Sequence, residues 1–410
     1  MRPYFVLSAT ALVVIFTLLY FFFYIPIAKA PRAVPTLAGI SVLPTVRVAP
    51  GAGAVEFQPP PKPPRSGGLG GGASTESSAT SADSIHTTSP KTKSAAKPKT
   101  LGTTLPTTKQ ALPAASNTQP TATFSTLARG AKNLRGALVN ILCTASPQGK
   151  IRSISGSGVI ISPKGVILTN AHIGQYFLLS NYPTPGGVRC VIRTGSPATA
   201  AYHASLLFIS PAWIYANPKV LTEAAPTGTG KYDIALLAIT KSTTNTSPPT
   251  SFPFVPLATR APTIGEPVVI GSYAAQFLST SEIQSSLYPT IAYSAVKNIY
   301  TLTSTSSDEV DVASFGGTAA AQEGSSGGGV LSSGGELVST ITTSTIKGAT
   351  GDRTLYAITA PYIRREYAAE TSQTLAALLK ESTSTARESF APEIAKLTTF
   401  LTQTLVAHQN

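Results

Sequence analysis

Between about residues 124 and 362 the chain is a series of short apolar segments, and this pattern restricts the fold more than any other feature of the sequence. The segments are rich in β-branched residues and are bounded by Gly, Pro, Ser or Asn, which is typical of strands separated by turns. Many short strands at this spacing predict an all-β barrel or sandwich. The expected strands are 137–145, 157–163, 165–172, 188–194, 203–210, 233–240, 267–273, 328–333, 336–343 and 354–359.

The start of the chain is expected to cross a membrane. Residues 4–27 carry no charged side chain, and the hydrocarbon core of a bilayer takes about 20 helical residues. A signal peptide has a shorter apolar region, of about 7–15 residues, and Pro31 directly follows the cleavage-like Ala28-Lys29-Ala30. Residues 1–30 are therefore predicted to be an uncleaved, single-pass signal anchor rather than a cleaved signal.

Residues 31–125 form a low-complexity segment rich in Pro, Ser, Thr and Gly. Such a composition buries too little apolar surface to offset the entropy lost on ordering, so the segment is predicted to be a disordered tether. It carries much of the formal net charge of +13. A basic segment can contact anionic lipid or cell-wall polymer. The favoured interpretation is a solvated linker that its lysines keep soluble. The basic run lacks interleaved aromatic residues or a recognisable module, so no nucleic-acid partner is expected.

The end of the chain, residues 366–410, is expected to be helical. Good helix formers fill 363–382, and a second helix is expected to begin at Ala391-Pro392, because proline suits a first helical turn. Apolar residues then recur at helical spacing: Phe390, Ile394, Leu397, Leu401 and Leu405. These helices are expected to dock on the domain or on another copy of the chain, so an oligomer is possible; a dedicated recruitment helix is the less favoured alternative.

Three short motifs carry chemistry. His172 ends the segment "GVILTNAH", Asp233 begins "DIALLAI", and Ser326 lies in the glycine-rich "QEGSSGGGVL". A serine nucleophile needs an adjacent base, and an aspartate orients the histidine that serves as that base. The order His, Asp, Ser is that of chymotrypsin-like double barrels. Each residue also has a purely structural alternative: a packed strand-end histidine, a strand-end carboxylate and a spacer serine.

The four segments around these residues resemble the trypsin-like serine proteases of the HtrA/Deg kind. The similar stretches are "GSGVIISPKGVILTNAHI", "YDIALLAI", "IGEPVVIGSY" and "GSSGGGVLSSGGELVSTITT". The resemblance covers about residues 130–365 and implies two six-stranded antiparallel β-barrels, with a protease domain over 126–365. The sequence after this domain is too short for the PDZ domain that many such proteases carry. Asp233 lies further from His172 than is usual in the family, and an inserted loop accounts for the distance.

The resemblance also implies an oxyanion hole and a substrate pocket. The backbone N–H groups of Gly324 and Ser326 are expected to hold the oxyanion, and Gly324 permits a backbone conformation that a side chain obstructs. Ala320 is expected near the base of the pocket, with Thr342, Thr343 and Ser344 along its wall. No acid falls at these positions, which favours cleavage after small or medium apolar residues. Two positions depart from the family pattern: Ser325 stands where Asn or Asp is usual, and Gly329 where Pro is usual. Both leave the oxyanion donors intact but are expected to loosen the turn.

The chain has two cysteines, Cys143 and Cys190, and neither has the spacing of a metal ligand. In an exported domain the two thiols can form one disulfide between strands, the alternative being two buried free thiols. The four histidines are scattered, so no metal and no cofactor is expected.

The sequence therefore predicts a membrane-anchored serine endopeptidase. Its domain is expected on the extracytoplasmic side, at the cell surface or in the periplasm, with unfolded or exported polypeptides as substrates. Hydrolysis is expected to pass through an acyl-enzyme formed on Ser326. The alternative is a catalytically weak or inactive protease-like domain that binds peptides by strand addition along 336–343.

Overall fold

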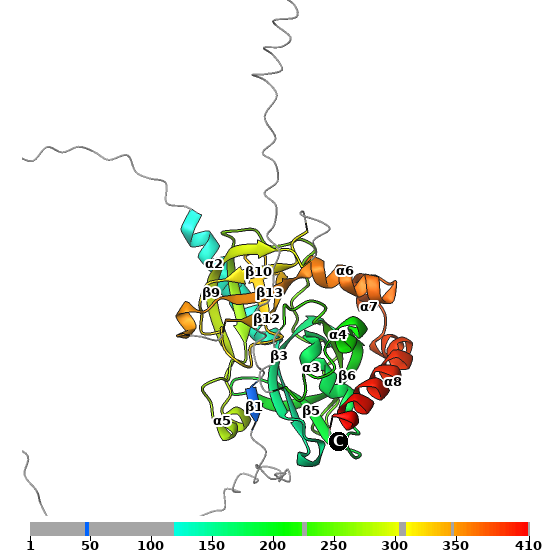
Figure 1. Ribbon diagram of the computed structural model, residues 1–410. Coiled ribbons are helices and arrows are strands. Elements are labelled where there is room, and N and C mark those ends of the chain that lie inside the picture. The colour runs from blue at the N-terminus through cyan, green and yellow to red at the C-terminus, as the bar shows by residue number, and fades with distance from the viewer. Residues whose placement is uncertain (1–45, 49–118, 224–227, 303–308, 346–347, 409–410) are drawn as a thin grey trace, which may run out of the picture. The chain divides into compact units, whose positions relative to one another are not determined.

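Two closed barrels of antiparallel strands make up the centre of the molecule (Figure 1). The computed structural model describes residues 46–48, 119–223, 228–302, 309–345 and 348–408. Each of the strands predicted from the sequence is present, with its ends shifted by a few residues at most positions. The prediction of two six-stranded barrels is confirmed.

The first barrel has the strand order β3-β2-β5-β6-β7-β4, and pairing of β4 with β3 closes it. A Cβ on Gly158 would lie 2.7 Å from the Ile167 side chain, so glycine at this position lets β3 and β4 pack closely inside the barrel. The strands are β2 (Leu138–Ala145), β3 (Ser153–Ser162), β4 (Val166–Thr169), β5 (Val188–Thr194), β6 (Thr199–Ile209) and β7 (Ala235–Ser242).

The second barrel closes in the order β10-β13-β12-β11-β8-β9. Two of its strands were not predicted. Most positions of β9 are half-buried or exposed, and it contains Lys297 and Asn298, while β10 has only four residues. The strands are β8 (Pro267–Ser272), β9 (Thr290–Tyr300), β10 (Val312–Phe315), β11 (Gly329–Ser332), β12 (Leu337–Ser344) and β13 (Leu355–Thr359).

Helix α2 (Gln119–Ala137) precedes the first barrel and packs against β3, β8 and β11. Its buried Leu134 occupies the space next to Gly271 and Gly329, where a Cβ would come within 2.7 Å of a leucine side chain. The sequence placed the beginning of this helix in the linker and its last residue in a strand. The ordered chain thus starts earlier than the predicted domain boundary at residue 126.

A short strand, β1 (Val46–Val48), pairs antiparallel with β3 at Ser153–Ser155. It lies inside the segment 31–125 that the composition predicts to be disordered, so that prediction does not hold for these residues. The rest of the predicted linker up to residue 118, and the predicted membrane segment 1–30, lie outside the described residues. Within the described part of the chain, no helix combines the length and apolar character needed to cross a membrane.

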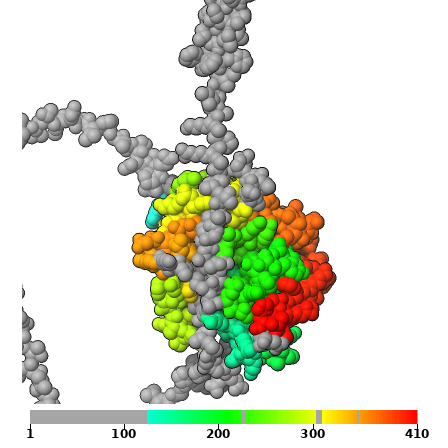
Figure 2. All heavy atoms as spheres, viewed as in Figure 1, coloured from blue at the N-terminus to red at the C-terminus, as the bar shows by residue number. Residues whose placement is uncertain are grey.

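Three helices follow the second barrel: the first of them contacts β12 and β13 of that barrel, and the last packs against β6 of the first barrel (Figures 1 and 2). They are α6 (Ala360–Thr371), α7 (Leu375–Lys380) and α8 (Thr383–Ala407). The single helix predicted over 363–382 is interrupted because Ser372 takes a left-handed conformation. The last helix begins at Thr383 rather than at 391, with the Ser382 hydroxyl capping it, so Pro392 lies inside the helix.

The apolar face of α8 is buried against β6 and the 3₁₀ turn η2 (Gln175–Leu179) of its own chain. Leu397, Leu401 and Leu405 are all buried there. Docking of the last helix on the domain was one of the two arrangements expected from the sequence, and the structure shows it. The expected oligomer through these helices stays a prediction.

The remaining elements are short. They are η1 (Pro147–Gly149), α3 (Ala171–Gly174), α4 (Pro211–Ala216), α5 (Thr280–Ser285) and η3 (Thr350–Asp352). Helix α4 opens the predicted inserted loop and contacts α8. The insertion is therefore partly ordered and packed against the C-terminal helices.

Candidate active site

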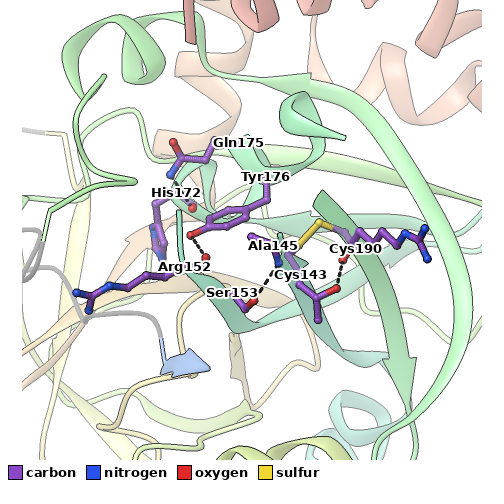
Figure 3. The surroundings of a disulfide bond; sticks show 10 residues. Cys143, Ala145, Arg152, Ser153, His172, Gln175, Tyr176 and Cys190 are labelled. Carbon is purple, nitrogen blue, oxygen red and sulfur yellow. Dashed lines mark hydrogen bonds between the residues drawn. A yellow bond between two sulfur atoms is a disulfide. The ribbon is translucent and has the colours of Figure 1, made fainter. Parts of the chain in front are cut away.

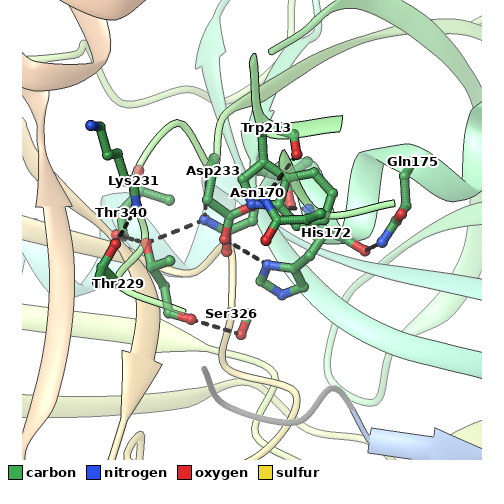
Figure 4. A network of polar contacts seen from close by, with 12 residues as sticks. Asn170, His172, Gln175, Trp213, Thr229, Lys231, Asp233, Ser326 and Thr340 are labelled. Carbon is green, nitrogen blue, oxygen red and sulfur yellow. Dashed lines mark hydrogen bonds and ion pairs between the residues drawn. The ribbon is translucent and has the colours of Figure 1, made fainter. Parts of the chain in front are cut away.

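His172 and Asp233 face each other in the first barrel, although they lie 61 residues apart in the sequence (Figure 4). His172 follows β4 in the single turn α3, and Asp233 precedes β7 by two residues. The Asp233 Oδ2 atom lies 2.7 Å from His172 Nδ1, and Asp233 Oδ1 accepts the His172 backbone N–H at 2.9 Å. Both side chains are buried. This two-point contact fixes the imidazole orientation relative to the carboxylate.

Neighbouring amides hold the backbone of this pair. Asn170 Nδ2 donates to the Asp233 carbonyl at 3.1 Å and reaches Thr342 Oγ1 of the second barrel at 3.3 Å. Gln175 Nε2 donates to the His172 carbonyl at 2.9 Å (Figures 3 and 4). Sequence reasoning assigned no role to Gln175, and it used Asn170 only as part of the motif before His172.

Ser326 lies in the turn before β11, on the second barrel. Its hydroxyl donates to the Thr342 carbonyl at 3.4 Å (Figure 4). His172 Nε2 is buried and has no hydrogen-bond partner among the described residues. The histidine–aspartate half of the predicted constellation is therefore assembled, while the serine hydroxyl points to β12 in this arrangement.

The backbone around Gly324 leaves two N–H groups without a hydrogen-bond partner among the described residues. The Glu323 carbonyl accepts the Ala275 N–H at 2.8 Å, and the Ser325 carbonyl accepts the Gly328 N–H at 2.9 Å. Because C=O and N–H point in opposite directions across a trans peptide, the N–H groups of Gly324 and Ser326 face away from these contacts. No hydrogen bond joins either N–H to another described residue. Both are free to receive a developing negative charge.

Gly324 itself fits the predicted role of a residue that must lack a side chain. Its φ is +88°, a value that other residues rarely adopt. A Cβ there would lie 2.7 Å from the Tyr273 carbonyl oxygen.

Ser157 of β3 supports the same turn from the first barrel. Its hydroxyl donates to the Gly324 carbonyl and accepts the Tyr273 N–H, both at 2.8 Å. Its backbone N–H donates to the Ser326 carbonyl at 2.8 Å. Sequence reasoning missed this role, although Ser157 lies in the Gly-Ser-Gly-Val stretch that it quoted.

The two departures in the turn have local explanations. Ser325 is buried and accepts a hydrogen bond from the Ser272 hydroxyl at 3.0 Å. At Gly329 a Cβ would come within 2.7 Å of Leu337 and 2.9 Å of Val159. Side chains of β12 and β3 therefore fill the space that a proline ring would need.

The four residues predicted to bind substrate lie on two segments next to Ser326. Thr342, Thr343 and Ser344 end β12, and Ala320 lies in the loop before the turn. β11 pairs with β12 only as far as Thr340, whereas β13 continues to Ser344. One edge of β12 beyond Ile341 thus lacks a neighbouring strand among the described residues, on the side where Ser326 lies.

Cys143 of β2 and Cys190 of β5 are opposite each other and form a disulfide, with an S–S distance of 2.06 Å (Figure 3). The bond ties two neighbouring strands of the first barrel. Within the described residues, no group of three or more His, Cys, Asp or Glu side chains gathers as a metal-ligand set.

Comparisons with known proteins give one family match and several similar solved structures. No curated protein matches the sequence. Among solved structures, the active form of the Rv3671c protease from M. tuberculosis is 19% identical, with a TM-score of 0.37, over 67% of this chain and 96% of that chain. The inactive form is 18% identical, with a TM-score of 0.36, over 63% and 100%. Residues 156–339 match the family described as the trypsin-like peptidase domain.

Proposed function

We propose that the chain is a serine endopeptidase in which His172, Asp233 and Ser326 form the catalytic triad. The observation that carries this proposal is the coincidence of three features in one place. These are the His172–Asp233 contact at 2.7 Å, the adjacent Ser326 turn, and the two unbonded N–H groups of that turn. A histidine that only packs at a strand end does not need the serine turn or its N–H groups. A serine that only spaces the chain does not need the histidine–aspartate contact.

In the proposed reaction, Ser326 Oγ rotates from Thr342 O to His172 Nε2 when substrate binds. Catalytic hydrogen bonds are often absent from a free enzyme and form only with substrate. Oγ attacks the scissile carbonyl carbon while its proton passes to Nε2, and the N–H groups of Gly324 and Ser326 stabilise the oxyanion. The imidazolium, stabilised by Asp233, protonates the leaving amine. Water then hydrolyses the acyl-enzyme by the same steps, with His172 as base.

The substrate backbone is proposed to add as a strand along Thr343 and Ser344, whose outer edge beyond Ile341 pairs with no other strand of the described residues. Ala320 lies at the expected base of the pocket, and the predicted pocket residues include no acid that would favour Lys or Arg, which supports small or medium apolar residues before the scissile bond. Unfolded or exported polypeptides fit this binding mode, because only an extended chain can pair with a strand edge.

The domain is proposed to act outside the cytoplasm, anchored by residues 4–27. The charge-free length of this segment supports anchoring. The Cys143–Cys190 disulfide supports an oxidising compartment, because structural disulfides are rare in the cytosol.

A fluorophosphonate probe tests the proposal directly. The full-length protein is treated with the probe beside Ser326→Ala and His172→Ala, and the labelled residue is located by mass spectrometry. Label on Ser326 alone, lost in both variants, is expected. A folded protein that takes no label contradicts the proposal. That result favours the peptide-binding alternative. The hydrogen bond from the Ser326 hydroxyl to the Thr342 carbonyl also supports this alternative.

A further inference from the structure

The triad is divided between two barrels, so its geometry depends on contacts that join them. His172 and Asp233 lie on the first barrel and Ser326 lies on the second. Helix α6 begins directly after β13 of the second barrel, where the Thr359 hydroxyl caps it by accepting the Tyr362 N–H. This helix is anchored to the serine-bearing barrel at its first turn.

From that first turn, Tyr362 reaches the loop that carries Asp233. The Tyr232 backbone N–H donates to the Tyr362 hydroxyl oxygen at 2.8 Å, between residues 130 positions apart in the sequence. Tyr362 is buried, and burial raises the pKa of its hydroxyl well above the usual range. The acceptor is therefore a neutral hydroxyl fixed in a packed environment.

The backbone that Tyr362 contacts is strained. Tyr232 has a φ of +60°, in the left-handed region. For an L-residue other than glycine or asparagine this conformation is unfavourable, and it persists only where the surroundings enforce it. The Ile234 N–H bonds to the Tyr232 carbonyl at 2.8 Å, so residues 232–234 form a tight turn around Asp233. Relaxation at Tyr232 displaces the carboxylate that orients His172.

A second contact from the same helix reaches the other side of Asp233. The Ser210 N–H donates to the Ile234 carbonyl at 3.1 Å. The Ser210 hydroxyl in turn donates to Glu370 Oε1 of α6 at 2.7 Å. Helix α6 therefore holds the Asp233 loop before and after the catalytic residue.

We propose that Tyr362 is a positioning residue for catalysis, which acts by holding Tyr232 in its left-handed conformation and thereby fixing Asp233 against His172. The inference rests on the proposed function. It assigns to the C-terminal helix a role in the chemistry of the site, in addition to covering apolar surface.

The test compares the fluorophosphonate reaction of the full-length protein with that of Tyr362→Phe. The maximal labelling rate, kinact, is expected to fall about tenfold, since small displacements of catalytic groups cost up to about a hundredfold in rate. The probe's KI is expected to stay within about twofold, because β12 and the turn of Ser326 are untouched. Tyr367→Phe is the matched control: Tyr367 is buried on the same helix, and its hydroxyl does not contact the Asp233 loop. The Tyr367→Phe variant is expected to lose stability and to keep the kinact of the wild type.

A second substitution separates positioning from general stability. Asparagine adopts the left-handed conformation readily, so Tyr232→Asn reduces the need for the hydroxyl. In that background Tyr362→Phe is expected to lower kinact less than about threefold. An equal loss in both backgrounds, or an equal loss in Tyr367→Phe, overturns the inference.

Further outcomes also decide the question. If Tyr362→Phe does not fold, recovery of folding and labelling in the Tyr362→Phe/Tyr232→Asn double variant supports the inference, and an unfolded double variant overturns it. A folded wild-type protein that takes no label refutes the proposed function, and this inference falls with it. Normal labelling of Tyr362→Phe refutes the inference alone.

Discussion

Two peptide groups decide at the residue scale whether the turn before Ser326 can stabilise an anion. The Glu323 and Ser325 carbonyls are both bonded away from the site, to the N–H groups of Ala275 and Gly328. The N–H groups of Gly324 and Ser326 lie on the other side of these peptides, and neither has a hydrogen-bond partner among the described residues. The φ of +88° at Gly324 makes this orientation possible.

Replacement of that glycine is expected to abolish most of the activity. In Gly324→Ala the new Cβ would meet the Tyr273 carbonyl oxygen at 2.7 Å, so the peptide must turn and one oxyanion donor is lost. Loss of one donor costs roughly 100- to 1000-fold in rate. Fluorophosphonate labelling kinetics measure the effect. Gly265→Ala is the control, because Gly265 has a similar φ of +84° and no atom within 4 Å of the added Cβ. Equal rate losses in the two variants contradict the prediction.

Glu370 is expected to make stability depend on pH. Burial is the largest cause that raises its pKa, to about 7, while hydrogen bonds from Ser210 and Ala212 act in the opposite direction. The folded protein therefore holds this proton more tightly than the unfolded chain. The free energy of unfolding falls as pH rises from about 4.5 to about 7.

Glu370→Gln removes this dependence, because the amide stays neutral at every pH. The variant is expected to match the wild type near pH 4.5 and to be more stable at pH 8. The difference at pH 8 is on the order of 1 kcal/mol, since solvent screens this half-buried group. Urea unfolding at both pH values measures it. Glu388→Gln, on an exposed position of α8, provides the control. A difference that does not change with pH contradicts the prediction.

At the scale of elements, the sequence reveals structure where a segment's own residues determine it. Strands such as β5 and β8 are runs of β-branched residues, and their predicted ranges are nearly those observed. β9 was missed because its half-exposed positions follow from pairing with β8 and β10. Tyr362 could not be assigned a role for the same reason, since its partner lies 130 residues away. His172, Asp233 and Ser326 could be predicted as a catalytic set because short motifs surround them.

The docking of α8 makes a prediction about stability. Leu401 is fully buried on the face that packs against the first barrel. Leu401→Ala removes this contact and leaves a cavity, which costs about 3 kcal/mol and lowers Tm by roughly 6–10 °C. Thermal unfolding followed by circular dichroism measures the change. Val406→Ala is the control on the same helix, where the side chain is 53% exposed. Comparable losses in both variants contradict docking of this face.

At the scale of the whole molecule, the site exists only because the two barrels are held together beside it. Asn170 and Ser157 reach from the first barrel to Thr342 and to the Ser326 turn. Tyr362 makes a contact in the opposite direction. It lies on α6, which follows the second barrel, and its hydroxyl accepts a hydrogen bond from the loop of Asp233. Contacts between the barrels thus determine both halves of the proposed triad.

The Ser157 hydroxyl is the contact whose removal most directly tests this dependence. Ser157→Ala keeps the backbone bond to Ser326 but leaves the Gly324 carbonyl and the Tyr273 N–H without their partner. Each unpaired buried group costs about 1–3 kcal/mol, and the Gly324 peptide is then free to turn away from the site. The labelling rate with the fluorophosphonate is expected to fall about 10- to 100-fold. Ser155→Ala is the control, because Ser155 is also buried on β3 but its hydroxyl accepts from Asn140 within the first barrel. This control is expected to lose stability and keep its labelling rate. If both variants lose the rate equally, the effect is a general one on β3 and the contact between barrels has no special role in the site.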